Sequence, residues 1–340
     1  MASVKVTSAE VARRAGVSQS AVSRVFTPGA SVSPKTAEKV RKAAAELGYR
    51  PNVLARAMVS GKSRIIGLVV AYLENHFYPV ALEKLSNALQ ARGYHVLVFM
   101  ASLKAENLDS VVDEILDYQV DGIIAASVAM SSDLAQRCQG AGVPIVLFNR
   151  TQDGEPFSSV TSDNRAGGRR VAEFLAAGGH RRIAHIAGWE GASTQVEREA
   201  GFRAALAEAG LTLHAREVGN FSIEEARAAT RRMFDRPDRP DAVFVANDHM
   251  AFGVMDVLRS ELGLSIPHDV SVVGYDDVPP AGWAAYDLTT VRQRANRMVE
   301  ATVEILLDQI EDPDAPPRRV AVDAPLILRG SARIPEGWTR

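Results

Sequence analysis

The 340-residue sequence predicts an α/β protein in which a small helical head precedes a body of doubly wound parallel sheets. Helix caps and apolar residues at helical spacing fill the head, residues 1–62. Beyond it, short apolar runs such as IIGLVVA, GIIAAS and VSVVGY alternate with longer helical patterns. Strands without polar alternation, separated by helices, indicate parallel sheets covered on both faces. About ten such strands suit two doubly wound halves in a core of residues 63–340.

The composition is that of an ordinary soluble protein. Apolar residues make up 46% and charged residues 24% of the chain, which excludes wholesale disorder. The single cysteine, Cys138, rules out a disulfide framework or a multi-cysteine metal site and fits a reducing compartment. The start MASVKVTS lacks the apolar core of a signal peptide, and the run IIGLVVAYL is far shorter than the roughly 20 residues that span a bilayer. We therefore expect a cytoplasmic protein with no membrane partner.

The net charge of −2 hides a strong asymmetry along the chain. Residues 1–64 hold twelve Lys or Arg and three Glu, a balance of +9, which leaves 27 basic and 38 acidic residues, a balance of −11, for the rest. A basic head on an acidic body favours contact between the head and a polyanion such as nucleic acid. A basic surface that is merely solvated is the alternative, and charge by itself does not decide between them.

The first helices of the head have clear start and stop signals. Thr7 and Glu10 are spaced as a capping box, which predicts a helix from Ser8 to Ala15. Gly16 supplies the positive φ of a tight turn, and Ser18 can cap a second helix over residues 19–26. This is the pattern of a helix-turn-helix, whose second helix lies in the major groove of DNA. An ordinary helical hairpin is the alternative.

If the pair is a helix-turn-helix, the polar residues at the start of its second helix face the bases. Gln19 and Ser20 then read base edges, and Arg24 reaches a guanine or a phosphate. Ser18 and Ser23 suit phosphate oxygens, and Thr7 is counted with these candidate DNA contacts.

Two more helices are expected before the core. Ser33, Pro34 and Gly48 predict a third helix that starts at Pro34 and ends at Gly48. Asn52 can cap a short helix over about residues 53–59. Seven residues are too few for a stable isolated helix, so this one either packs on something or folds only on binding.

Polar pairs follow four of the predicted strands: Asn149-Arg150, Asp163-Asn164, Asn247-Asp248 and Asp276-Asp277. In doubly wound sheets, ligands bind beyond the carboxyl ends of the strands. Amides and carboxylates, with the aromatic rings of Phe77, Phe221 and Trp283 nearby in sequence, suit a small polyhydroxylated ligand. For any single residue a helix cap is the simpler interpretation, so the prediction depends on the recurrence.

The sequence contains no recognisable catalytic constellation. The seven histidines show no metal-ligand spacing, and neither a nucleophile elbow nor a dinucleotide fingerprint is present. We therefore expect neither an enzyme nor a bound cofactor or metal. A sugar-binding protein of the periplasmic type would need an export signal and would lack the basic head. An enzyme with a DNA-binding appendage would need a catalytic cluster at the strand ends.

Taken together, these segments resemble the lactose-repressor (LacI/GalR) family of bacterial transcription regulators. The head VTSAEVARRAGVSQSAVSRVF and the body strings REAGFRAAL, ANDHMAFGVM and IPHDVSVVGYDD carry the resemblance, which covers nearly the whole chain. It implies a homodimer on a near-palindromic DNA operator and a periplasmic-binding-protein-like core. A sugar or sugar acid between two lobes would control operator affinity. The implied lobes are about 63–161 with 293–321, and 162–292 with 322–340.

The resemblance also implies roles for single residues. Asn52, Ala55 and Met58 would serve a hinge helix that enters the minor groove. The implied effector contacts are Phe77, Asp163, Arg198, Phe221, Asn247, Asp276 and Gln293. The chain departs from the family at Met58, where Leu is usual, and at Ala21, where many members have Thr. Its tail, RGSARIPEGWTR, has no leucine heptads, so a dimer is expected rather than a tetramer.

Overall fold

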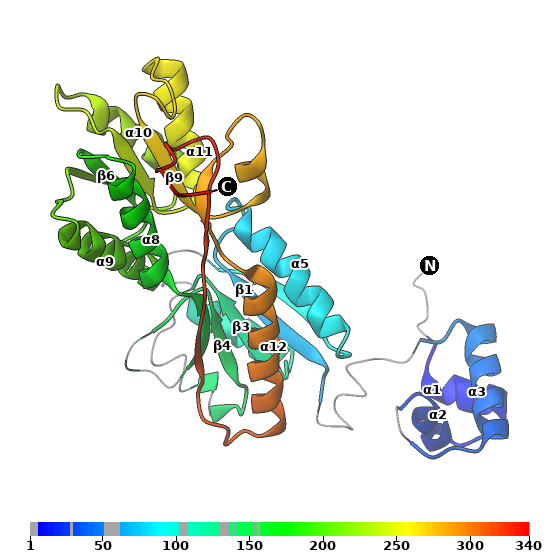
Figure 1. The fold of residues 1–340 in the computed structure, drawn as a ribbon. Helices are drawn as coiled ribbons and strands as arrows, with labels where there is room; N and C mark the ends of the chain where they lie inside the picture. Colours follow the sequence, from blue (N-terminus) through cyan, green and yellow to red (C-terminus); the bar gives the residue numbers. More distant parts are fainter. Residues whose placement is uncertain are drawn as a thin grey trace. The chain divides into compact units, whose positions relative to one another are not determined.

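The computed structural model describes residues 6–27, 30–50, 62–101, 108–128, 137–138, 140–152, 154 and 157–339. The chain divides into two compact units, Met1–Arg64 and Ile65–Arg340, here called the head and the core (Figure 1). The predicted hinge helix, with Asn52, Ala55 and Met58, lies outside the described residues.

The three predicted helices of the head are present: α1 (Ser8–Ala15), α2 (Gln19–Val25) and α3 (Pro34–Leu47). The capping box forms, because the backbone N–H of Thr7 donates to Glu10 Oε2 at 2.7 Å while that of Glu10 donates to Thr7 Oγ1. Gly16 adopts a left-handed φ of 67° and closes α1. The sequence signals therefore fixed both ends of α1 and the turn into α2.

A small cluster of apolar side chains holds the three helices of the head together. Val11, Val22 and Val40 come from different helices and are each fully buried. Ala12 and Ala44, also buried, are small enough to let the helices cross closely. Val25 is half-buried at the edge of this cluster.

The core contains two six-stranded sheets, one in each lobe. Lobe 1 has the strand order β11-β5-β4-β3-β1-β2, and lobe 2 has the order β12-β10-β9-β8-β6-β7. The strands of lobe 1 are β1 (Ile65–Val70), β2 (His95–Met100), β3 (Gly122–Ala126), β4 (Ile145–Phe148), β5 (Ser158–Ser162) and β11 (Arg319–Val322). Those of lobe 2 are β6 (Ile183–Ala187), β7 (Ala215–Val218), β8 (Ala242–Val245), β9 (Ser271–Asp276), β10 (Thr289–Arg292) and β12 (Leu326–Ile327).

The doubly wound parallel arrangement is confirmed. Neighbouring strands pair in parallel throughout, except that β12 runs antiparallel to β10. Successive residues of β1 alternate between two apolar clusters, with Ile66 and Leu68 on one face and Ile65 and Val69 on the other. A strand buried on both faces needs no polar alternation, which explains the continuous apolar runs in the sequence.

Helices cover the sheets of both lobes (Figure 1). They are α5 (Phe77–Gln90), α6 (Leu108–Asp117), α8 (Asn164–Ala177), α9 (Ser193–Glu208), α10 (Ile223–Phe234), α11 (Asp248–Asp256) and α12 (Ala295–Glu311). In lobe 1, α5 and α12 pack side by side and cover one face of the sheet. The α12 helix belongs to lobe 1 although it follows β10 of lobe 2, so the chain has crossed between the lobes.

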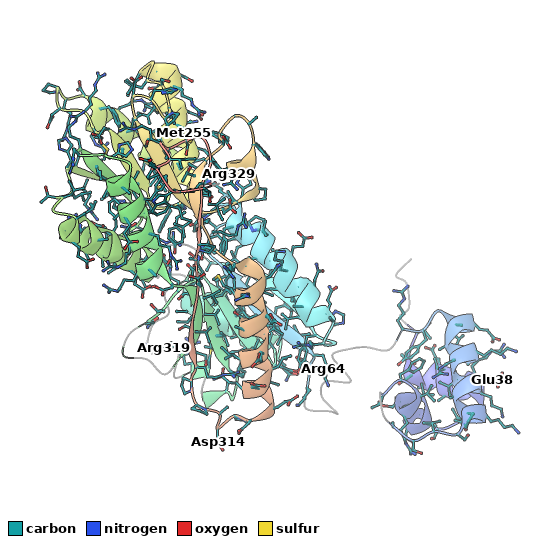
Figure 2. The ribbon with its side chains drawn as sticks, in the orientation of Figure 1. Glu38, Arg64, Met255, Asp314, Arg319 and Arg329 are labelled. Atoms are coloured by element: carbon teal, nitrogen blue, oxygen red, sulfur yellow. The ribbon has the colours of Figure 1, made fainter. Side chains whose placement is uncertain are left out.

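The chain crosses between the lobes three times. It leaves lobe 1 after Ser162, returns after Arg292, and leaves again after Val322. Figure 2 marks the last crossing, because Arg319 lies in β11 of lobe 1 and Arg329 lies beyond β12 in lobe 2. Every crossing passes the carboxyl ends of strands, where the polar pairs of the sequence are found.

Two glycines allow an unusually close approach of α8 and α9 in lobe 2. A Cβ atom at Gly168 would lie 2.0 Å from the backbone oxygen of Arg198, and one at Gly201 would lie 2.0 Å from that of Arg165. Both obstacles are backbone atoms, which cannot rotate out of the way. The two glycines therefore determine the position of α9 against α8 and, with it, the position of the Arg198 backbone.

We expect Gly168→Ala to lower the unfolding free energy of the core by about 1–3 kcal/mol, because α8 and α9 must move apart. Gly178→Ala is the matched control, because Gly178 caps the same helix with φ −71° and an added Cβ would meet nothing closer than 3.4 Å. That variant should stay within about 0.5 kcal/mol of the parent. Urea unfolding of the full chain measures both, and equal stability of the two variants would contradict the close packing.

Candidate functional site

The start of α2 presents the predicted DNA contacts to solvent. Ser18, Gln19, Ser20, Ser23 and Arg24 are all exposed, and the Ser18 hydroxyl caps the helix by accepting from the Ala21 N–H at 3.2 Å. Thr7, also exposed, is used in the capping box of α1. These exposed side chains are accessible to another molecule. Their roles in DNA binding remain predictions.

Two hydrogen bonds, which the sequence did not indicate, arrange these side chains in advance. Gln19 Nε2 donates to Ser8 Oγ on α1 at 2.8 Å, and the hydroxyls of Ser18 and Ser20 lie 2.9 Å apart. Both are exposed, so exchanging them for contacts with bases costs little net free energy. Arg24 forms no ion pair with any residue that the structure describes in the head.

A small polar cavity lies between the two lobes of the core. Its volume is about 10 Å³, which is about the space that one water molecule needs. Each lobe contributes five residues to its lining: Tyr72, Asn75, Tyr78, Asn149 and Arg150 from lobe 1, and Thr194, Arg198, Phe221, Asn247 and Asp276 from lobe 2. We call this set the cleft. A larger ligand can enter it only if the lobes part.

Asp276, the last residue of β9, is the hub of the cleft. Its Oδ1 accepts from Gln293 Nε2 at 2.7 Å, and its Oδ2 accepts from Asn75 Nδ2 of lobe 1 at 3.2 Å. Burial raises the pKa of this carboxyl, while the Arg198 guanidinium, 3.6 Å away, acts against that rise. The carboxylate therefore joins the two lobes and offers acceptor oxygens to hydroxyl groups.

Arg198 reaches the same point from α9 and is 2% exposed. Its Nε donates to Asn164 Oδ1 at 2.9 Å, and its Nη1 donates to the backbone oxygen of Ala246 at 2.7 Å. The guanidinium also stacks over the Tyr275 ring, 3.6 Å from the centroid. These contacts hold the arginine rigidly, so it presents a fixed donor face to the cleft.

Phe221 and Asn247 complete the lobe 2 side. Gly188 leaves room for the Phe221 ring, because a Cβ there would lie 2.2 Å from it. Asn247 Oδ1 caps α11 by accepting from the Met250 N–H at 3.0 Å. Helix capping and a place in the cleft are thus compatible for Asn247, although the sequence posed them as alternatives.

The predicted effector residues fall into three groups. Arg198, Phe221, Asn247 and Asp276 line the cleft. Gln293 is outside the lining, but its Nε2 donates to Asp276 and its Oε1 accepts from Ser162 Oγ at 3.0 Å. Phe77 and Asp163 are not part of the cleft lining.

The Phe77 ring is buried in the core of lobe 1 and stacks on Phe148 with centroids 6.1 Å apart. Asp163 caps α8 by accepting from the Ala166 N–H at 2.9 Å and lines a separate groove of about 290 Å³. Trp283, an aromatic of the original pattern, is 57% exposed and is not part of the cleft lining. Any contact of these residues with a ligand stays a prediction.

Sequence reasoning missed several cleft residues, and Asp248, one residue of the strand-end pairs, does not line the cleft. Tyr72, Asn75, Tyr78 and Thr194 were not singled out, although Asn75 follows β1 and the strand-end rule could have found it. Asp248 turns inward, where it accepts from Thr290 Oγ1 at 2.6 Å and the Val278 N–H at 3.0 Å. Burial and the charge of Asp276 raise the pKa of Asp248.

A buried polar network anchors the helix that carries Arg198. His185 Nδ1 lies 3.0 Å from the backbone oxygen of Phe244, and its Nε2 lies 3.1 Å from Gln195 Nε2. Burial lowers the pKa of His185 to about 4, so its ring is neutral. Burial alone would raise the pKa of Glu199, but hydrogen bonds from Arg216 and Arg203 and the charge of nearby groups lower it to about 2.

The described residues contain no cluster of three or more His, Cys, Asp or Glu side chains that could hold a metal ion. No helix in the described part of the chain is long and apolar enough to cross a membrane.

Comparison with known proteins assigns both units. Residues 7–52 match the family described as bacterial regulatory proteins, lacI family, and residues 172–332 match a periplasmic binding protein-like domain. The chain is 32% identical over 337 residues to the HTH-type transcriptional repressor PurR of Vibrio vulnificus, covering 98% of this chain and 99% of the relative. The match to the Lac repressor dimer bound to operator and the anti-inducer ONPF has a TM-score of 0.87 at 30% identity, covering 96% and 99%. A CelR–cellobiose complex matches with a TM-score of 0.73 at 33% identity and the same coverage.

A helix-turn-helix head and a two-lobed core with a polar cleft define a DNA-binding transcription regulator that responds to a small metabolite. The chain belongs to the LacI family of bacterial regulatory proteins. The resemblance carried by its sequence motifs is thereby confirmed, as is the predicted α/β class.

The neutral state of His185 predicts a pH-dependent stability. Since its pKa is about 4 in the folded core and about 6.5 when unfolded, its stabilising effect is complete above pH 6.5 and is lost as pH falls toward 4. The difference in unfolding free energy between the parent and His185→Gln should therefore shrink by about 2 kcal/mol from pH 7.5 to 5. Urea unfolding measures it. The exposed His268→Gln is the control, and a parallel shrinkage there would refute the assignment to His185.

Proposed function

We propose that the protein acts as a homodimeric repressor whose two heads hold a near-palindromic operator, and that a small polyhydroxylated metabolite in the cleft changes operator affinity. In this proposal the protein has no enzymatic activity and acts in the cytoplasm, where a bacterial regulator binds DNA. The Lac repressor match, a dimer on its operator, and the cellobiose complex of CelR support this proposal.

The single observation that carries the proposal is the position of the cleft at the crossings between two lobes. A ligand that takes hydroxyl contacts from Asp276 and Arg198 must replace the Asn75–Asp276 bond and the Arg150–Thr194 bond, both of which join the lobes. The ligand therefore changes how the lobes are held. A ligand shifts such an equilibrium by its differential affinity for the two arrangements.

In a dimer, the arrangement of the lobes would reach the DNA through the spacing of the two heads. Half-sites on an operator lie at a fixed separation, so a change in the spacing of the heads alters operator affinity. The ligand releases the protein from DNA if the spacing of the heads in the liganded dimer does not match the half-sites. It tightens binding if that spacing matches them.

For DNA recognition, we expect Gln19→Ala to relax base preference at one position of each half-site, with a loss of roughly 1–3 kcal/mol on the operator. Gln19 is exposed, so the head should still fold. Fluorescence anisotropy with operator and random duplexes at one salt concentration measures the effect. A loss of equal size on both duplexes would show that Gln19 does not read a base.

For the ligand response, we expect Asp276→Asn to weaken binding of the responsive metabolite about 10- to 100-fold, because a charged acceptor of hydroxyl groups is lost. A thermal-shift screen of sugars and sugar derivatives identifies that metabolite, and calorimetry then gives its affinity. Asp314→Asn is the control, because Asp314 is exposed at the far end of lobe 1 (Figure 2). An unchanged affinity in Asp276→Asn would place the ligand elsewhere.

A further inference from the structure

We propose that the ligand of the cleft is a sugar acid, and that Arg150 of lobe 1 receives its carboxylate. This inference rests on the proposed function and concerns which class of metabolite the cleft selects. Its basis is a buried guanidinium that forms no ion pair with the described residues and has one unpaired N–H, next to a second side chain with an unpaired polar atom.

Arg150 follows β4 and is 5% exposed. Its Nη1 donates to Thr194 Oγ1 across the cleft and its Nη2 donates to Ser127 Oγ at 3.0 Å, while its Nε is buried without a hydrogen-bond partner. No carboxylate among the described residues forms an ion pair with it. Within hydrogen-bond distance the guanidinium has only neutral hydroxyls, and the nearest opposite charge that acts on it is the more distant Asp276, whose pKa it lowers. A buried charge without a direct ion pair is costly, and a ligand carboxylate would lower that cost.

The preceding residue points to the same place. Asn149 Nδ2 donates to the Tyr78 hydroxyl at 3.2 Å, and the other polar atom of its amide is buried without a partner. Asn149 also has a left-handed φ of 57°, which breaks the alternation of a strand and lets two consecutive side chains reach the cleft. Two adjacent side chains thus offer unused hydrogen-bonding groups at one spot.

The charges of the cleft favour an anionic ligand. Its lining holds two guanidiniums, Arg150 and Arg198, and one carboxylate, Asp276. This net positive lining stands out in a core whose Lys, Arg, Asp and Glu sum to −11. Arg198 already has Asp276 at 3.6 Å, so Arg150 is the guanidinium left for a ligand.

A neutral sugar would leave Arg150 without a direct ion pair, whereas a carboxylate would accept from its buried Nε. Guanidinium–carboxylate contacts are among the stronger hydrogen bonds in proteins. The same cleft contains Asp276, which repels a doubly charged phosphate more than a singly charged carboxylate. The hydroxyl groups of a sugar acid would still use Asp276 and Arg198.

The test compares ligands that differ only at the charged group. Glucuronate is paired with glucose, galacturonate with galactose, and gluconate with glucitol, while glucose 6-phosphate tests a phosphate instead. Thermal shift of the full chain finds binders, and calorimetry gives their dissociation constants. We expect at least one carboxylate to bind the parent protein more tightly than its neutral counterpart and more tightly than the phosphate.

Variants assign that preference to Arg150. Arg150→Gln should weaken binding of the acid about 10- to 100-fold more than binding of its neutral counterpart, so that the ratio of the two dissociation constants collapses. Arg150→Lys, which keeps the charge, should restore part of the ratio. Arg297→Gln, at an exposed arginine on α12, is the matched control and should keep the parent ratio.

The ratio separates ligand selection from a structural role, because a general loosening of the cleft would weaken both members of a pair. The inference is overturned if neutral sugars bind better than the acids, if none of the acids binds, or if Arg150→Gln keeps the ratio. The proposed function is decided separately. It fails only if no metabolite alters operator binding, whatever the charge of that metabolite.

Discussion

The structure of the cleft depends on one carboxylate, that of Asp276, held between two lobes and away from water. A buried carboxylate is stable only if its oxygens are well hydrogen-bonded. Gln293, just beyond β10 where the chain crosses to lobe 1, and Asn75 from lobe 1 supply those bonds, and Arg198 supplies the nearest positive charge. The positions of the strand ends, the crossings and α9 are thus linked through one group.

The same requirement explains why lobe 2 is built so tightly around Arg198. A guanidinium must be held firmly to serve a neighbouring carboxylate, and here the glycine contacts between α8 and α9 fix its backbone. Asn164, Ala246 and Tyr275 then fix its side chain. Lobe 1 meets this surface with Asn75 and Arg150, whose side chains donate across the cleft to Asp276 and Thr194.

Local signals in the sequence predicted more of the fold than of the site. The capping box at Thr7, the turn at Gly16 and the apolar strands are set by nearest neighbours, so their sequence patterns could be read directly. Asn75 and Asp276 are 201 residues apart, and no local pattern encodes their bond. Asp163 and Phe77 lie outside the cleft lining, where Asp163 caps α8 and Phe77 stacks on Phe148, so the ligand role that the motif match gave them stays a prediction.

Few bonds hold the lobes together at the cleft, and this bears on how a metabolite can act. Asn75–Asp276, Arg150–Thr194 and the Thr151 N–H to Ser193 Oγ bond each contribute about 1 kcal/mol. A sum of roughly 3 kcal/mol lies within the usual range of allosteric coupling free energies. A ligand that replaces these bonds with its own needs only a few well-placed contacts to reset the arrangement. Arg150 has no ion pair among the described residues, so the strongest of those contacts is left to the ligand.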